Sequence, residues 1–466
     1  MEETKISNSY KIARTLRCRN TRIPGTLGRL TTSMGMVGAD IGNITTVHVG
    51  HHYSVRDIEV FLDDEEHLTR LKKAIAGVPD VALLEVRDDV LTLHTNGKIR
   101  MVSTVPIKSI DTLRKVYTPG VAEVCNLIAK RPFYKDTYTS IPFSVAIVTD
   151  GTAILGLGDI GPVAGMPVME GKAALLEQLV GLSGIPILID TKDVEQIVAT
   201  VRHIAPTFGG IHIEDIASPR CFEIEEQLQR DLSIPVMHDD QRATAVVTLA
   251  ALINACKSVG VSLDEAQVGV IGLGAAGLTI AEFIMSYTGK PVLGAARTEA
   301  SLQRHAARRG IPSTLDEIMA KADIVVATSG VRDLIKPAMI KKGQIILPLS
   351  NPYPEIDPEL ALKAGAALAL DGRTVNNLLA YPGLWRGTLD ALASRITYDM
   401  YRAAALAISG ATEQGELVPS PLMPQVHLAV AHAVAKAAME SGVARRTLGP
   451  DYFENNDVKA DWARAL

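Results

Sequence analysis

Two pairs of acidic residues follow apolar runs in the middle of the chain. Glu214 and Asp215 come directly after GGIHI, and Asp239 and Asp240 come directly after IPVMH. If both runs are strands of an α/β sheet, acids at their carboxyl ends face the ligand crevice. Three such oxygens, completed by substrate and water, suit a hard divalent cation such as Mg²⁺ or Mn²⁺ better than zinc. Acids after strands also act as helix N-caps, and the pattern alone leaves both roles open.

A lysine and a tyrosine are further candidates for proton transfer. Lys172 follows VMEG and precedes AALLEQLVGL, so we expect it at a helix N-terminus, where the macrodipole disfavours positive charge and lowers the pKa of the ammonium. A lysine of that kind can act as a base near neutral pH, although an isolated lysine there is more often a surface residue. Tyr117 stands before Thr118-Pro119, and on its own such a tyrosine is usually a packing residue.

The glycine pattern G-x-G-x-x-G occurs twice, at 156–161 and at 272–277. The second copy ends a β-run and opens an uninterrupted helical segment, whose amides can bind a pyrophosphate while the glycines allow close approach. At the first copy Pro162 and Pro167 are expected to break the helix at once, so we interpret it as a loop near the chemistry. Tight strand–helix packing is the alternative for the second copy. We place the dinucleotide at Gly272, Gly274, Ala275, Ala276 and Gly277.

The surrounding pattern predicts two α/β units that would position these residues. Apolar runs at 143–148, 185–189 and 211–213 alternate with helices at 170–180 and 194–204, which indicates a parallel sheet. Residues 268–350 repeat the alternation as a second, Rossmann-type unit, and the Ala-rich residues 389–441 are expected to be helical.

Residues 1–97 read as a smaller α+β unit. We expect a strand at 10–20, a helix at 26–36, a strand at 56–62, a helix at 65–75 and a strand pair across 83–93. The turn RIPGTLGRL after the first strand, and GADIGNITT after the helix, resemble ACT domains, which are small ligand-sensing modules. A packing or dimerisation appendage without a ligand is the alternative.

Composition limits the classes of function. The 466 residues suggest about three domains, and the net charge of −5 with 4% aromatic residues argues against nucleic-acid binding. Four scattered cysteines without a C-x-x-C pair fit a reducing cytoplasm. The N-terminus MEETKISNSYK lacks an apolar export signal, and the most apolar stretch, 268–285, is too short for a membrane span.

Taken in order, several segments resemble the bacterial malic enzyme family over roughly residues 100–440. They are YTPGVAEVC, VTDGTAILGLGDIGPVAGMPVMEGK, IAPTFGGIHIEDIASPRCFEIEEQL, IPVMHDDQ, GLGAAG, LSNPYPEI and VNNLLAYPGLWRGTLD. The resemblance implies roles for particular residues: Tyr117 as the catalytic tyrosine, Lys172 as the general base, Asp239 as its acidic neighbour, Glu214, Asp215 and Asp240 as metal ligands, and Asn351 and Asn377 as contacts of substrate and nicotinamide.

The resemblance predicts an α/β enzyme that converts (S)-malate to pyruvate and CO₂ while reducing NAD or NADP. The expected domains are an ACT-like regulatory domain (1–97) with a small-metabolite effector, a substrate and metal domain (98–241), and a nucleotide domain with C-terminal helices (242–466). We expect a homodimer or higher homo-oligomer. A related β-hydroxy-acid decarboxylating dehydrogenase, a malolactic converter and a non-catalytic metabolite sensor are the alternatives.

Two further features bear on specificity. The family pattern HDDQHGTA is here HDDQRATA, so Arg242 and Ala243 replace an imidazole and a glycine, which we expect to change substrate choice or rate. The strand PVLGAA ends at Arg297, about 20 residues beyond the glycine turn, where NAD enzymes carry an acid. A guanidinium there can bind a 2′-phosphate, so NADP is expected to be preferred, whereas an offset of one or two residues would place Glu299 there.

Overall fold

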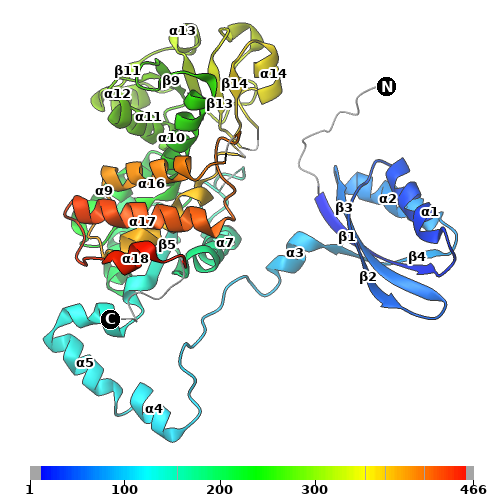
Figure 1. Ribbon diagram of the computed structural model, residues 1–466, viewed down its shortest axis with the longest axis horizontal. Helices are drawn as coiled ribbons and strands as arrows, with labels where there is room; N and C mark the ends of the chain where they lie inside the picture. The colour runs from blue at the N-terminus through cyan, green and yellow to red at the C-terminus, as the bar shows by residue number, and fades with distance from the viewer. Residues whose placement is uncertain (1–11, 155, 352, 373, 414, 458–466) are drawn as a thin grey trace. The chain divides into compact units, whose positions relative to one another are not determined.

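The computed structural model describes residues 12–457 apart from 155, 352, 373 and 414 (Figure 1). The chain divides into two compact units, one ending at Arg100 and one beginning at Met101. The division falls close to the boundary expected after residue 97. The expectations for the extreme N-terminus, including a strand beginning at Tyr10 and the lack of an export signal, concern positions outside the described residues.

The first unit is an antiparallel sheet with two helices. The sheet has the strand order β2-β3-β1-β4. The chain order confirms the expected ACT-like fold: β1 (Ile12–Thr21), α1 (Thr26–Met36), β2 (Asp40–Val49), β3 (Tyr53–Leu62), α2 (Glu65–Ala76) and β4 (Val81–Asp88). Leu16, Ile58 and Leu71 belong to its core, to which the strands and both helices contribute. Off the core, Asp57 accepts hydrogen bonds from Arg17 and Arg87, at 2.8 and 2.7 Å.

Sequence reasoning was wrong at two places in this unit. β2 was not expected as a strand: polar residues make up half of it, and nearly all of its residues are exposed. The second strand expected within 83–93 is instead a helix, α3 (Asp89–His94). The carboxylate of Asp88 accepts a hydrogen bond from the amide of Leu91 at 2.9 Å, so it caps this helix and ends the strand.

The second unit begins with short helices and continues into a parallel sheet of order β6-β5-β7-β8. The short helices are α4 (Ile110–Val116), α5 (Val121–Lys130), η1 (Pro132–Tyr134), α6 (Lys135–Tyr138) and η2 (Ile141–Phe143). The sheet and its helices are β5 (Ser144–Thr149), α7 (Pro162–Val180), β6 (Ser183–Leu188), α8 (Val194–Ile204), η3 (Ala205–Thr207), β7 (Gly210–Ile213), α9 (Arg220–Asp231) and β8 (Val236–His238).

Helix α7 corrects one prediction about this region. Pro162 and Pro167 were expected to break the helix after the first glycine motif, but α7 begins at Pro162 and contains Pro167. Proline is tolerated at the first helical position, because its missing N–H would have no partner there in any case. The helix is therefore longer at its N-terminus than expected, and Lys172 lies within it rather than at its start.

The nucleotide-type sheet follows with the parallel order β11-β10-β9-β12-β13-β14, the classic doubly wound arrangement. Its elements are β9 (Val268–Ile271), α11 (Ala275–Thr288), β10 (Leu293–Ala295), α12 (Glu299–Ala307), β11 (Ile311–Pro312), α13 (Leu315–Lys321), β12 (Ile324–Ala327), η4 (Pro337–Met339), β13 (Ile345–Pro348), α14 (Pro358–Lys363) and β14 (Leu368–Ala369).

Further helices complete the second unit. They are α10 (Asp239–Val259), η5 (Asn377–Leu379), α15 (Tyr381–Asp390), α16 (Tyr398–Gly410), α17 (Pro424–Glu440) and α18 (Pro450–Glu454). Helix α10 is long and apolar enough to cross a membrane, yet most of it is buried against α11 and α16, so it is a core helix of this unit. The domain boundary expected at 241/242 falls within this continuous helix.

Candidate active site

Lys172 is the centre of a buried polar cluster at the carboxyl ends of β7 and β8. Its ammonium lies 2.5 Å from Asp239 Oδ2 and 3.2 Å from Glu214 Oε1, and it stands over the ring of Tyr381. Burial alone would lower the pKa of Lys172, but the two carboxylates outweigh it and hold that pKa well above its usual value. This corrects the expectation of a lowered pKa at a helix N-terminus.

Glu214, Asp215 and Asp240 lie together, as their positions after two neighbouring strands predict. One carboxylate oxygen of each falls in a group whose members are all within 4.8 Å of one another. Burial and the neighbouring carboxylates raise the pKa of Asp215 to about 9 and that of Asp240 to about 6. Asp215 Oδ2 is buried and has no hydrogen-bond partner in the described part of the chain.

This acid group fits a hard divalent cation. Like charges this close are unfavourable unless protons or a cation neutralise them. The group offers only oxygen ligands, and one of them, the buried Asp215 Oδ2, accepts no hydrogen bond from the described residues. Both properties match what Mg²⁺ or Mn²⁺ requires. The helix N-cap alternative does not account for the acids, because none of the three caps a helix through its side chain.

His212 is a member of the cluster that sequence reasoning missed. The indole N–H of Trp385 donates to its Nδ1 at 2.9 Å, which leaves the ring proton on Nε2 for Glu214 Oε2, at 2.6 Å. His212 lies two residues before Glu214 in the direction of strand β7, so the two side chains share a face. That i, i+2 spacing was the signal available in the sequence.

Asp239 connects the lysine to the C-terminal helices. Its Oδ2 accepts a hydrogen bond from Asn377 as well as from Lys172. Asn377 begins η5, close to where a substrate bound at Lys172 would lie. Asn351 follows β13 and, among the described residues, is not hydrogen bonded to this cluster.

Tyr117 does not join the cluster. It ends α4, is 66% exposed, and its side chain makes no hydrogen bond with any described residue. The two roles implied for Tyr117 and Lys172 would bring both residues to one substrate, but the described part of the chain shows no contact between them. The reason lies in the path of residues 101–143, which enter the sheet at the opposite, amino end of β5.

The second glycine motif forms the tight turn that the dinucleotide site requires. Gly272 has φ +95°, and a Cβ on Gly277 would lie 1.8 Å from the carbonyl oxygen of Gly272. Ala275 and Ala276 open α11, so their amides face the turn. A pocket of about 690 Å³ adjoins it, lined among others by Gly272, Gly274, Ala295, Arg297, Ser301 and Arg304.

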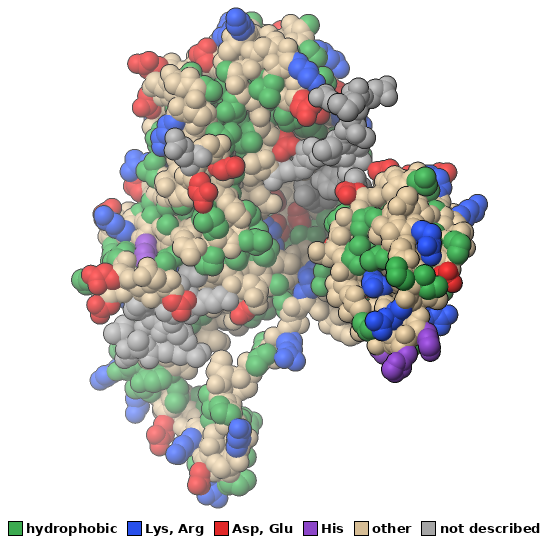
Figure 2. Space-filling view, turned by 45° about the vertical axis from the view of Figure 1, so that its right-hand side comes forward, with side chains coloured by type: hydrophobic (Ala, Val, Ile, Leu, Met, Phe, Trp, Pro, Cys, Tyr) green, Lys and Arg blue, Asp and Glu red, His purple; other side chains and the backbone are tan. Residues whose placement is uncertain are grey.

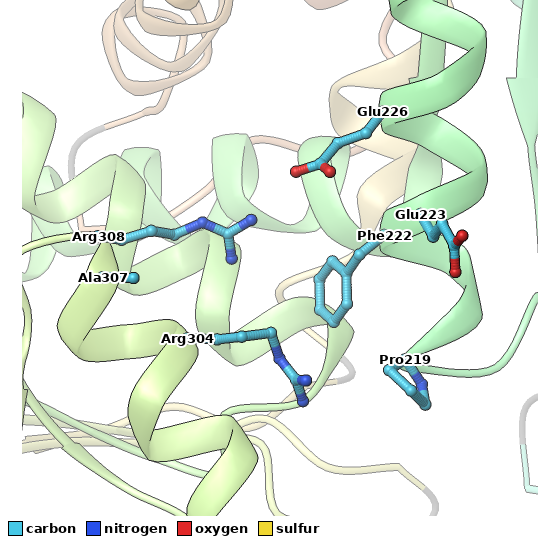
Figure 3. Close-up of a pocket in the computed structure, with 7 residues that line it drawn as sticks. All are labelled: Pro219, Phe222, Glu223, Glu226, Arg304, Ala307 and Arg308. Atoms are coloured by element: carbon cyan, nitrogen blue, oxygen red, sulfur yellow. The ribbon is translucent and has the colours of Figure 1, made fainter.

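A smaller pocket of about 390 Å³ lies between α9 and α12 (Figure 3). Arg304 of α12 and Arg308, which directly follows this helix, project toward the ring of Phe222, each 5.7 Å from its centroid. Glu223 and Glu226 line it from α9. Arg304 also lines the nucleotide pocket, so the two pockets adjoin.

The unusual Arg242 is held by two glutamates. Its guanidinium lies 3.1 Å from Glu225 and 3.8 Å from Glu282. Glu225 also accepts the amide of His238 at 3.0 Å, directly before the two aspartates. The positive charge expected to alter the substrate region is therefore balanced by α9 and α11.

Comparisons with known proteins show that the chain is similar to malic enzymes. A family model described as the malic enzyme N-terminal domain matches residues 96–229, and one described as the NAD binding domain of D-isomer specific 2-hydroxyacid dehydrogenases matches residues 233–342. NAD-dependent malic enzyme 1 of Bacillus subtilis is 55% identical, covering 91% of this chain and 98% of that protein. The NAD-dependent malic enzyme of Geobacillus stearothermophilus is 39% identical, covering 90% and 92%.

A solved structure of the malic enzyme from Pyrococcus horikoshii is also similar. It matches with a TM-score of 0.73 at 39% identity, over 81% of this chain and 94% of that chain.

Proposed function

Since this chain belongs to the malic enzyme family and catalyses the oxidative decarboxylation of malate, we propose that the Lys172 cluster performs the chemistry. The observation that carries this assignment is the contact of one buried lysine with both Asp239 and Glu214. Lys172 takes the proton of the carbon-2 hydroxyl as hydride leaves carbon 2 for the nicotinamide. Asp239 holds the amine in place for that transfer, and Asn377 in turn donates a hydrogen bond to Asp239.

We assign the metal site to Glu214, Asp215 and Asp240. These three carboxylates would hold a divalent cation, whose chemistry there would be Lewis-acid polarisation of the substrate oxygen and stabilisation of the negative charge that develops when CO₂ leaves. Cation binding would also neutralise Glu214, which now helps to keep Lys172 protonated. The pKa of Lys172 would fall as a result, toward that of the neutral amine that a base requires, while Asp239 still opposes the effect of burial.

Tyr117 is proposed to protonate carbon 3 of the enolate, which completes pyruvate. This role comes from the family resemblance, and no contact within one chain supports it. It is separable from the base by experiment: Tyr117→Phe should harm decarboxylation more than the reduction of added pyruvate-like ketones, whereas Lys172→Ala should abolish both.

The choice of cofactor follows from two opposed observations. Arg297 lines the nucleotide pocket, and none of the described lining residues is a carboxylate, which supports NADP. Both relatives named above are NAD-dependent, and both alignments include the nucleotide unit for most of its length. We propose NAD as the preferred cofactor, which reverses the preference expected from Arg297 alone.

The test is an absorbance assay at 340 nm with malate, Mg²⁺ or Mn²⁺, and each nicotinamide cofactor in turn. Reduced cofactor with stoichiometric pyruvate and CO₂ supports the proposal. Lactate as the product would favour the malolactic alternative, and full activity in the presence of EDTA would contradict the assigned metal site. We also propose a cytoplasmic location and a small-metabolite effector for residues 1–97.

A further inference from the structure

Glu355 is a buried carboxylate that is held by uncharged groups. Many acidic side chains lie at the surface of the protein, as the red side chains in Figure 2 show, whereas Glu355 is 0% exposed. The groups that donate hydrogen bonds to its side chain in the described part of the chain are amides and hydroxyls. Burying a carboxylate is costly unless hydrogen bonds replace the lost water, so the position of Glu355 depends on these donors.

The donors belong to two neighbouring loops of the nucleotide-type sheet. Oε1 of Glu355 accepts hydrogen bonds from the amide and the hydroxyl of Ser329, at 2.6 and 2.8 Å, and from the hydroxyl of Ser350 at 2.5 Å. Its Oε2 accepts the amide of Ser350 at 3.4 Å. Ser329 follows β12 and Ser350 follows β13, so one carboxylate connects the carboxyl ends of two adjacent parallel strands.

Backbone groups join the same two loops. The amide of Gly330 donates to Ser350 Oγ at 2.9 Å. The amide of Ile335 donates to the carbonyl oxygen of Glu355 at 3.0 Å. Glu355 therefore contacts the loop after β12 with its backbone as well as its side chain, and the relative position of the two loops depends on it.

These loops carry residues of the proposed binding sites. Ser329 lines the pocket of about 690 Å³ beside the glycine turn. Asn351, the proposed contact of substrate and nicotinamide, directly follows Ser350. Asn351 also lies against Gly372, where an added Cβ would be 2.8 Å from Asn351 Nδ2. The orientation of Asn351 is therefore sensitive to a shift of the loop that Glu355 holds.

The strand order separates the two halves of a bound dinucleotide. In a doubly wound sheet of this order, the dinucleotide spans the crevice where the order reverses, which is between β9 and β12. The glycine turn and Arg297 follow β9 and β10, on the side that binds the ribose of the adenosine half. The nicotinamide half is therefore expected beyond β12 and β13.

We propose that Glu355 is a positioning residue for the nicotinamide half of the dinucleotide. By binding Ser329 and Ser350 together, it fixes the loops after β12 and β13, and Asn351 with them. Since Glu355 has no exposed surface, it acts through these residues rather than by contact with the dinucleotide. The inference rests on the proposed placement of the dinucleotide at the glycine turn and on the proposed role of Asn351.

Titration of the intact enzyme with NAD and with ADP-ribose, which lacks the nicotinamide ring, tests this role without turnover. Glu355→Ala removes all four hydrogen bonds of the side chain. The apparent affinity for NAD should then fall about tenfold, because fewer molecules hold the loops in the competent arrangement, while that for ADP-ribose should change less than about twofold. Glu355→Gln, which keeps the shape and one acceptor oxygen, should retain most of the NAD affinity.

Two further variants keep the result interpretable. Ser350→Ala removes one of the hydroxyls that donate to Glu355 and should also weaken NAD selectively. Added to Glu355→Ala it should have little further effect, because both changes break the same contact. Glu359→Gln alters an exposed acid on α14 and is the matched control, which should change neither affinity nor the melting temperature.

Three results would overturn the proposal. Equal losses of NAD and ADP-ribose affinity in Glu355→Ala would show that Glu355 supports the nucleotide unit as a whole. Unchanged NAD affinity in that variant would show that the loops do not need it. If Glu355→Ala fails to fold, the same comparison is made with Ser350→Ala, and unchanged or equal affinities there overturn the proposal. Wild-type enzyme that binds neither probe would overturn the placement of the dinucleotide, and the role of Glu355 with it.

Discussion

The affinity of the metal-free enzyme for Mn²⁺ should rise steeply with pH. The pKa of Asp215 is raised to about 9 and that of Asp240 to about 6, because both carboxyls are buried beside other acids. A cation that binds these oxygens must displace their protons. Between pH 6.5 and 8 one proton is displaced, so the apparent association constant should grow about tenfold per pH unit. At pH 7 the protonation of Asp215 costs about 2.7 kcal/mol of binding free energy.

The same shift has a consequence for the stability of the metal-free protein. Because the folded pKa of Asp215 lies above its unfolded value, the folded state holds more protons between about pH 4 and 9, and stability falls as pH rises through this window. Bound cation removes that loss. Mg²⁺ should therefore raise the melting temperature more at pH 8.5 than at pH 6.5.

Electron paramagnetic resonance of free Mn²⁺ at several pH values measures the affinity directly, without turnover. Below about pH 6 the binding of one Mn²⁺ should displace close to two protons, since Asp240 is then protonated as well. The association constant should then change nearly a hundredfold per pH unit, or about tenfold for each proton displaced. In Asp240→Asn the second proton should no longer be displaced below about pH 6. The roughly tenfold change of the Mn²⁺ association constant per pH unit above about pH 6.5 should persist. An affinity that varies less than threefold between pH 6.5 and 8 would refute the reasoning.

Three other outcomes are expected. Lys172→Ala should reduce turnover of malate by about 10²- to 10⁴-fold, and near-normal kcat would contradict its assignment as base. Arg297→Ala should weaken any binding of NADP far more than that of NAD in a direct titration, and equal losses would show that it does not read the 2′-phosphate. Deleting residues 1–97 should abolish any metabolite effect on malate affinity, expected as a coupling of about 1–3 kcal/mol, and identical kinetics across a metabolite panel would favour a packing role.

The arrangement of strands and acids was predictable because local pattern and sheet topology act together. Apolar runs ended by Glu214-Asp215 and Asp239-Asp240 are parallel strands, and parallel strands bring their carboxyl ends to one edge. The glycine turn at 272–277 was likewise recognisable, because only residues without side chains fit there.

The features that the sequence did not predict depend on contacts between segments that are distant in the chain. The high pKa of Lys172 comes from carboxylates 42 and 67 residues away, which a helix-terminus argument does not see. Trp385 donates its hydrogen bond to His212 although the two residues are 173 positions apart in the sequence. The sequence around Glu214 therefore gives no sign of this hydrogen-bond chain beyond the i, i+2 spacing of His212 and Glu214. The position of Tyr117 follows from how residues 101–143 join the amino end of β5, and the motif YTPG carries no information about that connection.

Helix α10 contacts both the proposed cation site and the helix that begins at the glycine turn. Its first turn carries Asp240, and the next residue, Gln241, accepts a hydrogen bond from Thr279 of α11, the helix that begins at the glycine turn. Arg242 and Glu282 link the same two helices. If dinucleotide binding shifts the glycine turn, these contacts carry the shift to a cation ligand. Metal and dinucleotide would then change each other's affinity by the same factor, so the order in which the enzyme loads them would alter its kinetics without altering the free energy of the fully loaded state.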